Sequence, residues 1–363
     1  MLFDPIKIAS LQIKNRIVRS ATYEKRADED GFVTEELLSF YEALAKGGTG
    51  LIVTGFAMVH HSGRVLPKMM SIHSDRYMDG FRALADRVHK AGSKLVVQVA
   101  HGGRQSPPVF LGGESPIAPS AVPDPSSGVT PREMTNDEIW QIVEAFGEAA
   151  RRARDAGCDG VQIHAAHGYL ASGFLSPHTN RRDDYWGGDD ERRYHFVEEV
   201  IEAMLDKAGS GFPILIKMNC DDLLPGGLNP EQSARIAVRL QADGIAAIEI
   251  SGGMREAPIK TIRPGILKPE QEAYFRQAGA LFKKRVSVPV ILTGGMRSRA
   301  VMESVLAANE ADMIGLSRPL IREPNLPELM LNGKEKADCI SCNKCANFLK
   351  YEKVECLELQ AKG

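Results

Sequence analysis

The sequence predicts an α/β protein that folds as a single (β/α)8 TIM barrel with a long capping loop and a C-terminal extension. Short runs rich in β-branched residues alternate with longer helical patterns along the chain, and eight such units can be counted. This alternation is typical of a parallel sheet, and eight units are the number that closes a barrel. The length of 363 residues is ordinary for a barrel that forms one domain.

The eight predicted strands are bounded by Gly, Pro or polar turn residues, which interrupt regular structure. They span residues 16–20, 50–54, 94–99, 160–164, 213–218, 246–251, 289–293 and 312–316. The clearest helix begins at Thr135, which forms a capping box with Glu138, and ends at Gly157, a typical C-terminal cap. We therefore expect strand–helix units along the whole barrel.

We expect the barrel to span residues 1–333 and a cysteine-rich tail to span 334–363. Within the barrel, residues 105–134 contain seven prolines, which exclude a long helix. A connection of this length inside a compact domain usually has a function. We therefore interpret it as a cap over the barrel mouth; the alternative is a surface insertion without a role.

Composition excludes several classes of function. Hydrophobic residues make up 43% and charged residues 25%, the balance of an ordinary globular protein, and the net charge of −2 predicts no basic face for nucleic acid. Asp4 and Pro5 interrupt the first apolar run, so we expect neither a signal peptide nor a membrane segment, and we expect a cytoplasmic protein. Four of the six cysteines lie between 339 and 356, which suggests a metal-site pattern rather than a secreted disulfide framework.

The fourth predicted strand is followed by three polar side chains. His164, His167 and Tyr169 should lie at the carboxyl end of the barrel, where active sites of this fold occur. Two imidazoles can hold a carbonyl or carboxylate oxygen while a phenol supplies a proton. They could equally be ligands of a metal ion, with His101 after the third strand as a third ligand, or purely structural histidines.

Two further polar residues interrupt apolar strands. Gln98 in the third strand offers a donor and an acceptor, which suits the edge of a flat heterocycle. Lys217 in the fifth strand needs an anionic or strongly polar partner, because burying a lone cation is costly. Beside a reduced flavin it would stabilise negative charge; the alternative is a Schiff-base lysine, as in barrel lyases and aldolases.

Glycine-rich turns follow the last three predicted strands. Gly295 follows the seventh strand, Ser317 and Arg318 follow the eighth, and Gly253 follows the sixth. Glycines let backbone N–H groups approach phosphate oxygens, and arginine adds a planar cation. Because barrels of this kind often bind phosphate in the loops after strands seven and eight, we expect a phosphate site here.

One block of the sequence is specific enough to indicate a family. It comprises His164-Ala-Ala-His167-Gly-Tyr169-Leu, followed at fixed spacing by Phe174-Leu-Ser-Pro177, Asn180, Arg182, Asp184, Tyr185, Gly187-Gly188 and Arg192. Residues 1–330 thereby resemble the old yellow enzyme (NADH:flavin oxidoreductase) family. The resemblance implies FMN held without a covalent bond. It implies that FMN contacts Ser20, Ala21, Thr22, Gly55, Gln98, Lys217, Gly295, Ser317 and Arg318.

The resemblance also implies a mechanism with two half-reactions. NADH or NADPH reduces FMN and leaves, and an α,β-unsaturated carbonyl compound then binds at the same face. His164 and His167 hold the substrate oxygen, and Tyr169 protonates the carbon next to the carbonyl. Family members differ in substrate and in nicotinamide preference, and they often form homo-oligomers. A flavin- or metal-binding protein without turnover is the remaining alternative.

The C-terminal cysteines form a separate pattern. Cys339, Cys342, Cys345 and Cys356 resemble the iron–sulfur segment of the 2,4-dienoyl-CoA reductase branch, which carries additional nucleotide-binding domains. That branch has one more residue between its second and third cysteines. Four thiolates can hold [4Fe–4S] or zinc, and the alternative is a reduced tail without metal.

Overall fold

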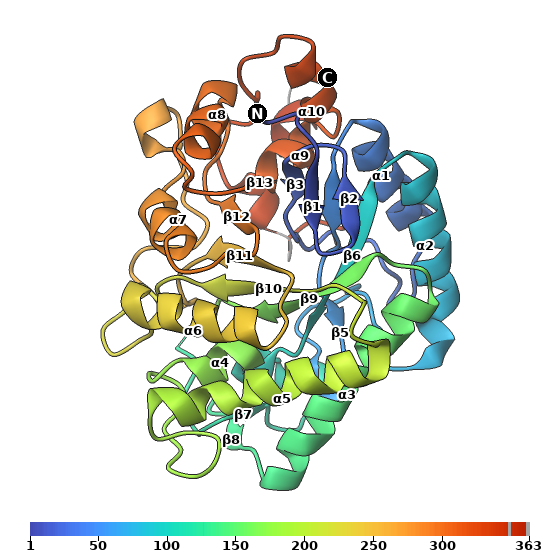
Figure 1. The fold of residues 1–363 in the computed structure, drawn as a ribbon. Helices are drawn as coiled ribbons and strands as arrows, with labels where there is room; N and C mark the ends of the chain where they lie inside the picture. The colour runs from blue at the N-terminus through green and yellow to red at the C-terminus, as the bar shows by residue number, and fades with distance from the viewer. Residues whose placement is uncertain (126, 348–349, 361–363) are drawn as a thin grey trace.

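The computed structural model describes residues 1–125, 127–347 and 350–360, and it contains a closed parallel barrel (Figure 1). The strands are β3 (Ile17–Arg19), β4 (Leu51–Val53), β6 (Lys94–Ala100), β9 (Gly160–Ala165), β10 (Ile214–Asn219), β11 (Ala247–Ser251), β12 (Val290–Thr293) and β13 (Met313–Leu316). The ring closes because β4 pairs with both β3 and β6. The predicted barrel is confirmed, and each predicted strand agrees with its counterpart to within one residue at either end.

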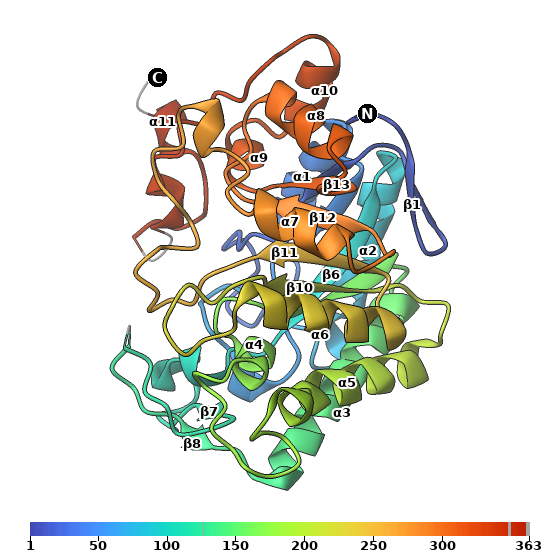
Figure 2. The same cartoon turned by 60° about the vertical axis from the view of Figure 1, so that its left-hand side comes forward.

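Helices cover the outside of the barrel (Figures 1 and 2). They are α1 (Glu35–Lys46), α2 (Met78–Lys90), α3 (Asn136–Asp155), α4 (Leu170–Leu175), α5 (Asp190–Ala208), α6 (Pro230–Ala242), α7 (Arg276–Lys283), α8 (Arg299–Ala307), α9 (Arg318–Arg322), α10 (Leu326–Leu331) and α11 (Leu357–Gln360). The predicted capping box is present: Thr135 accepts the Glu138 N–H, and the Glu138 carboxylate accepts the Thr135 N–H. Gly157 follows this helix with φ +81°, a left-handed conformation that favours glycine.

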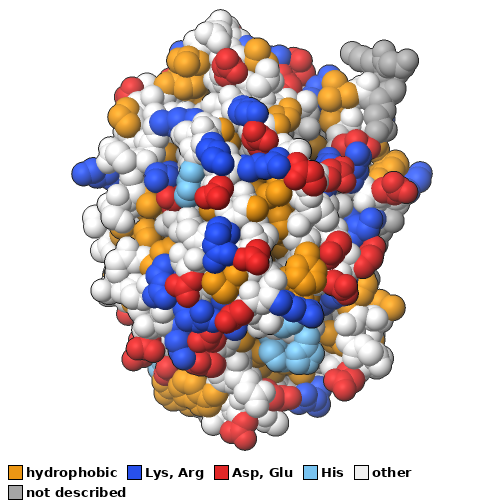
Figure 3. All heavy atoms as spheres, turned by 90° about the vertical axis from the view of Figure 1, so that its right-hand side faces the viewer, with side chains coloured by type: hydrophobic (Ala, Val, Ile, Leu, Met, Phe, Trp, Pro, Cys, Tyr) orange, Lys and Arg blue, Asp and Glu red, His pale blue; other side chains and the backbone are white. Residues whose placement is uncertain are grey.

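Shorter elements join these units. The remaining strands are β1 (Ile6–Ile8), β2 (Leu11–Ile13), β5 (Ala57–Met58), β7 (Ile117–Ala118) and β8 (Arg132–Glu133). The 3-10 helices are η1 (His61–Gly63), η2 (Asp75–Tyr77), η3 (Gly103–Gln105), η4 (Pro108–Phe110), η5 (Pro269–Gln271) and η6 (Lys344–Ala346). No helix in the described part of the chain is both long and apolar enough to span a bilayer. Basic and acidic side chains are interspersed over the face shown in Figure 3, as the small net charge predicts.

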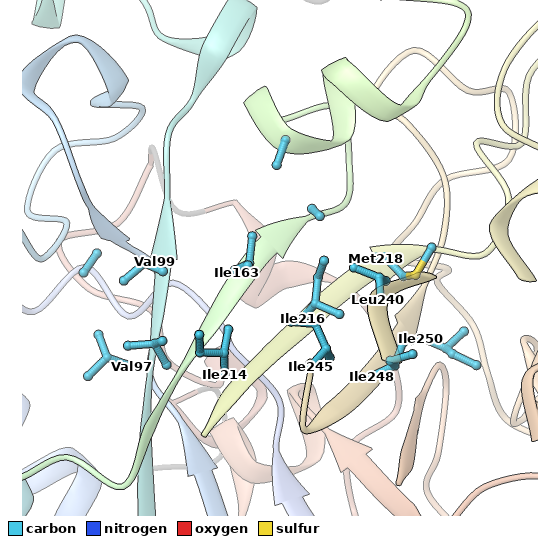
Figure 4. Close-up of a cluster of buried hydrophobic side chains, with 14 of the residues drawn as sticks. Val97, Val99, Ile163, Ile214, Ile216, Met218, Leu240, Ile245, Ile248 and Ile250 are labelled. Atoms are coloured by element: carbon cyan, nitrogen blue, oxygen red, sulfur yellow. The ribbon is translucent and has the colours of Figure 1, made fainter. Parts of the chain in front are cut away.

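The barrel strands bury two different faces. Ile214, Ile216 and Met218 of β10 belong to the cluster between strands and helices, together with outward-facing residues of β6, β9 and β11 (Figure 4). The intervening Leu215 belongs to a second cluster inside the barrel, which the β1–β2 hairpin closes with Ile13. Because side chains alternate along a strand, the polar residues between outward-facing ones face the barrel axis.

A buried histidine, His101, and a partly buried one, His60, lie near the ends of β6 and β5. His101 is 1% exposed, and its Nδ1 accepts the Gly103 N–H at 3.0 Å. Its Nε2 lies 2.9 Å from the Ser62 hydroxyl, which also contacts His60. Burial lowers the pKa of His101 to about 3 and that of His60 to about 4. Both imidazoles are therefore neutral in the folded protein at neutral pH.

We expect the folded protein to lose stability as the pH falls from 7.5 to 5. His101 binds a proton below an ordinary pKa of about 6.5 only when the chain unfolds, so acid favours the unfolded state. At pH 5 this residue alone accounts for about 2 kcal/mol of the loss. Urea unfolding at the two pH values should show a smaller loss for His101→Asn than for the wild type. Equal losses in the two proteins would contradict the assignment.

Candidate active site

One cavity at the carboxyl ends of the strands contains most of the residues that the sequence singled out. It is lined by Ser20, Ala21, Thr22, Gln98, His164, His167, Tyr169, Lys217, Gly295, Ser317 and Arg318, among others. These residues come from strands or strand ends all around the barrel, and the fold brings them together because parallel strands all end at the same rim.

Two predicted cofactor contacts do not line this cavity. The Gly55 N–H donates to the carboxylate of the buried Glu24 at 2.7 Å, so this glycine faces the protein's own chain. Gly253 has φ +88°, and a side chain there would meet Thr261. Both glycines allow close packing of the chain around the cavity, and their contact with a cofactor stays a prediction.

His164 and Tyr169 lie edge to face, with ring centroids 4.6 Å apart, and His164 and His167 do so at 5.2 Å. Burial, followed by the charge of nearby Lys217, lowers the pKa of His167 to about 3. Burial likewise lowers the pKa of His164 well below its ordinary value and raises that of Tyr169 to about 12. At neutral pH the cavity thus presents two neutral imidazoles and a protonated phenol.

The turn that follows β9 orients this trio. His167 adopts φ 63° and Gly168 φ 82°, so two successive residues are left-handed. The His167 N–H donates to Asn219 Oδ1 at 3.1 Å, and its Nε2 lies 2.7 Å from the Ser251 hydroxyl. The ends of β10 and β11 therefore hold the backbone and the ring of His167.

Lys217 lies beneath the cavity and is paired. Its Nζ donates to the Ser20 hydroxyl at 2.8 Å and to the Glu249 carboxylate at 3.0 Å. A nitrogen that donates to both Ser20 and Glu249 is not free to attack a carbonyl group as a Schiff-base nucleophile. This pairing weighs against the lyase alternative.

Sequence reasoning missed two interior residues, Glu249 and Gln162. Neither lines the cavity, but Glu249 accepts hydrogen bonds from Lys217 and from the Gln162 side chain. A signal was present: each is a polar residue between apolar neighbours in a predicted strand, in Ile248-Glu249-Ile250 and Val161-Gln162-Ile163. It also missed Phe56 and Tyr274, which line the cavity without a distinctive motif.

The Gly294–Gly295 turn and Arg318, which line the cavity, fit a phosphate group. Gly294 and Gly295 have φ 144° and 72°, and a side chain on either would meet the Tyr274 ring at 2.9 Å. Arg318 donates to the Arg263 carbonyl at 2.9 Å. Within the described residues Arg318 forms no ion pair with a carboxylate. Backbone N–H groups beside an arginine without an acidic partner are suited to an anion.

The C-terminal cysteines lie near Arg318. Cys339, Cys342, Cys345 and Cys356 line one small pocket, and Cys345 also lines the main cavity. The segment packs along the loop that follows β11, where the Gly265 N–H donates to the Ser341 carbonyl (Figure 2). All six cysteines are free thiols. However, no three His, Cys, Asp or Glu side chains in the described ranges are placed to share a metal ion, so this arrangement does not fit a cluster or zinc.

The structure also shows where His101 and the segment 105–134 lie. His101 turns toward Ser62 rather than toward His164 and His167, so the three histidines do not converge on a metal. Among the described residues of 105–134, none lines the main cavity. This segment instead contains η4, β7 and β8 and borders a separate cavity of about 410 Å³ beside His60 and His61. Its role as a cap stays a prediction.

Comparison with known proteins identifies the family of this chain. Residues 1–337 match the model of the NADH:flavin oxidoreductase / NADH oxidase family. The chain is 36% identical over 345 residues to an NADH oxidase of Thermoanaerobacter brockii, with 94% of this chain and 52% of that protein covered. It thus spans about half the length of that relative.

Two shorter relatives match over nearly their whole length. An NADPH dehydrogenase of a Geobacillus species is 36% identical over 328 residues, with 90% of this chain and 92% of that protein covered. The solved old yellow enzyme homologue from Zymomonas mobilis superposes with a TM-score of 0.79 at 27% identity, with 93% of this chain and 95% of that chain covered. This chain therefore belongs to the NADH:flavin oxidoreductase / NADH oxidase family, the family of old yellow enzyme.

Proposed function

We propose that this protein is an FMN-dependent NAD(P)H oxidoreductase that reduces the activated C=C bond of α,β-unsaturated carbonyl compounds. The observation that carries the proposal is the meeting of His164, His167 and Tyr169 in one cavity above Lys217. FMN, when bound, supplies the acceptance of hydride from the nicotinamide and its transfer to the substrate. Residues of this chain would bind the cofactor, polarise the substrate carbonyl and donate the proton.

The cavity fits FMN in the chemistry of its lining. The Gly294–Gly295 turn, Ser317 and Arg318 would hold the phosphate. Gln98 and Lys217 provide an amide and a cation for the polar edge of the ring system. One cavity that offers both sets of groups supports a nucleotide with a phosphate and a polar heterocycle.

His164, His167 and Tyr169, which line the cavity above Lys217, suit the reduction of an enone. Neutral His164 and His167 can each donate one hydrogen bond to the carbonyl oxygen, and polarising that oxygen withdraws electrons from the double bond. Tyr169 keeps its proton at neutral pH and can donate it to the carbon next to the carbonyl. The protonation states required of all three residues are those that burial imposes.

Bound FMN and its reduction by a nicotinamide separate this proposal from its alternatives. We expect the purified protein to be yellow, to release FMN on denaturation, and to lose its flavin absorbance when NADH or NADPH is added without oxygen. A lyase that uses Lys217 would be colourless and would be trapped covalently by borohydride with its substrate. A protein that binds FMN but that neither nicotinamide reduces would favour the binding protein without turnover.

We expect Tyr169→Phe to lower the turnover of 2-cyclohexenone by about 100-fold or more, because general-acid catalysis contributes factors of this size. Anaerobic reduction by NADPH should stay at the wild-type rate, since that step needs no proton from Tyr169. Stopped-flow absorbance measures the two half-reactions separately. Tyr185→Phe is the matched control, because Tyr185 is exposed and donates to Glu199 away from the cavity. Wild-type turnover in Tyr169→Phe would remove this residue from the proposed role.

A further inference from the structure

A fully buried carboxylate lies directly beneath the cavity. Glu249 of β11 is 0% exposed and does not line the cavity itself. Its oxygens accept four hydrogen bonds, from Ser20 Oγ at 2.6 Å, Thr293 Oγ1 at 2.8 Å, Gln162 Nε2 at 2.8 Å and Lys217 Nζ at 3.0 Å. Every donor comes from a different element, so one carboxylate ties together side chains from around the barrel.

The strand register explains why these groups meet. Lys217 is directly opposite Glu249 in the β10–β11 pair, and Gln98 is directly opposite Gln162 in the β6–β9 pair. The side chains of directly opposed residues point to the same face of a sheet, which here is the barrel axis. Gln98 Nε2 donates to Gln162 Oε1 at 2.7 Å, so a continuous path of hydrogen bonds joins Gln98 to Glu249.

The partners of this carboxylate distinguish a functional role from simple core packing. Ser20, Lys217 and Thr293 all line the cavity, and Gln162 connects to Gln98, which also lines it. Each of the four hydrogen bonds therefore connects Glu249, directly or through Gln162, to a residue that lines the cavity. Gly315 of β13 leaves room for the network, because a side chain there would overlap Thr293 Oγ1 at 2.0 Å.

Electrostatics favours a charged pair at this position. Burial alone opposes ionisation of Glu249, but the charge of Lys217 and the donors around the carboxylate together hold its pKa below the ordinary value. The ammonium of Lys217 is therefore offset by a negative charge 3.0 Å away, on the side remote from the cavity. Anything bound in the cavity experiences the two charges together.

We propose that Glu249 is a positioning residue that holds Lys217 and Gln98 against the edge of bound FMN and, by offsetting the charge of Lys217, sets the reduction potential of the flavin. This inference rests on the proposed function, because it assigns the bound group as FMN. Reduced FMN carries negative charge at the edge that faces such a cation, so an uncompensated Lys217 would favour the reduced form. The negative charge of Glu249 weakens this preference for the reduced form.

The test compares Glu249→Gln, which removes the charge but keeps the side-chain length, with the wild type. The midpoint potential of bound FMN is measured by equilibration with a redox dye, and the dissociation constant of FMN by fluorescence titration. We expect the ratio of reduced to oxidised flavin at a fixed potential to rise about tenfold or more, a shift of roughly +30 mV for a two-electron couple. We also expect FMN to bind more weakly, because Lys217 and Gln98 lose their fixed positions.

Two further variants separate charge from structure. Glu249→Asp keeps the charge but shortens its reach, so we expect weaker FMN binding with a smaller rise in potential. Asp159→Asn is the matched control: Asp159 is a mostly buried carboxylate that accepts from Lys94, His89 and the Leu95 N–H where β9 begins, at the other end of the barrel. Its removal should leave the flavin potential unchanged.

The outcomes decide between the inference and the proposed function. If both Glu249 variants match the wild type in potential and FMN affinity, or if Asp159→Asn shifts the potential as much, the inference is overturned. Should Glu249→Gln fail to fold, Glu249→Asp decides alone, and wild-type values there would also overturn it. A wild-type protein that does not retain FMN would instead refute the proposed function.

Discussion

The ion pair between Lys217 and Glu249 is the interaction on which the cavity depends. A cation beneath a ligand is useful only where water does not solvate it, and burying it without a partner would be prohibitively costly. The ion pair is shielded from water because Glu249 is fully buried, and donors from around the barrel complete the hydrogen bonding of its carboxylate. Closure of the barrel is what places so many donors around one carboxylate.

Alternation along the strands lets the same barrel hold an apolar and a polar layer. In β10, Leu215 packs in the cluster closed by the β1–β2 hairpin, and Lys217, two residues later, faces the cavity floor. In β11, Ala247 and Glu249 are related in the same way. The apolar layer fills the amino end of the barrel, and the polar layer faces the cavity at the carboxyl ends of the strands.

The sequence predicted what depends on local pattern and missed what depends on register. Apolar runs bounded by Gly and Pro located all eight barrel strands, and the His164–Tyr169 block located the residues above the floor. Glu249 went unnoticed because its partner Lys217 lies on the neighbouring strand, and the pairing of two strands cannot be read from either one. The sequence could not show that Gly55 contacts Glu24, because a glycine at a strand end serves a ligand or a nearby side chain equally well. The cysteine spacing predicted neighbouring thiols, but ligation depends on where each sulfur points.

Burial acts differently on neighbouring groups, and the presence of partners decides how. Lys217 and the hydrogen-bond donors around Glu249 hold the pKa of that carboxyl below its ordinary value despite its burial. His164 and His167 stay neutral because burial and the nearby ammonium both lower their pKa values. If Lys217 were neutral, less would oppose the protonation of His167; if Glu249 were absent, the cation would act on the cavity without compensation. The Lys217–Glu249 pair therefore affects both the protonation of His164 and His167 and the electric field that acts on a ligand in the cavity.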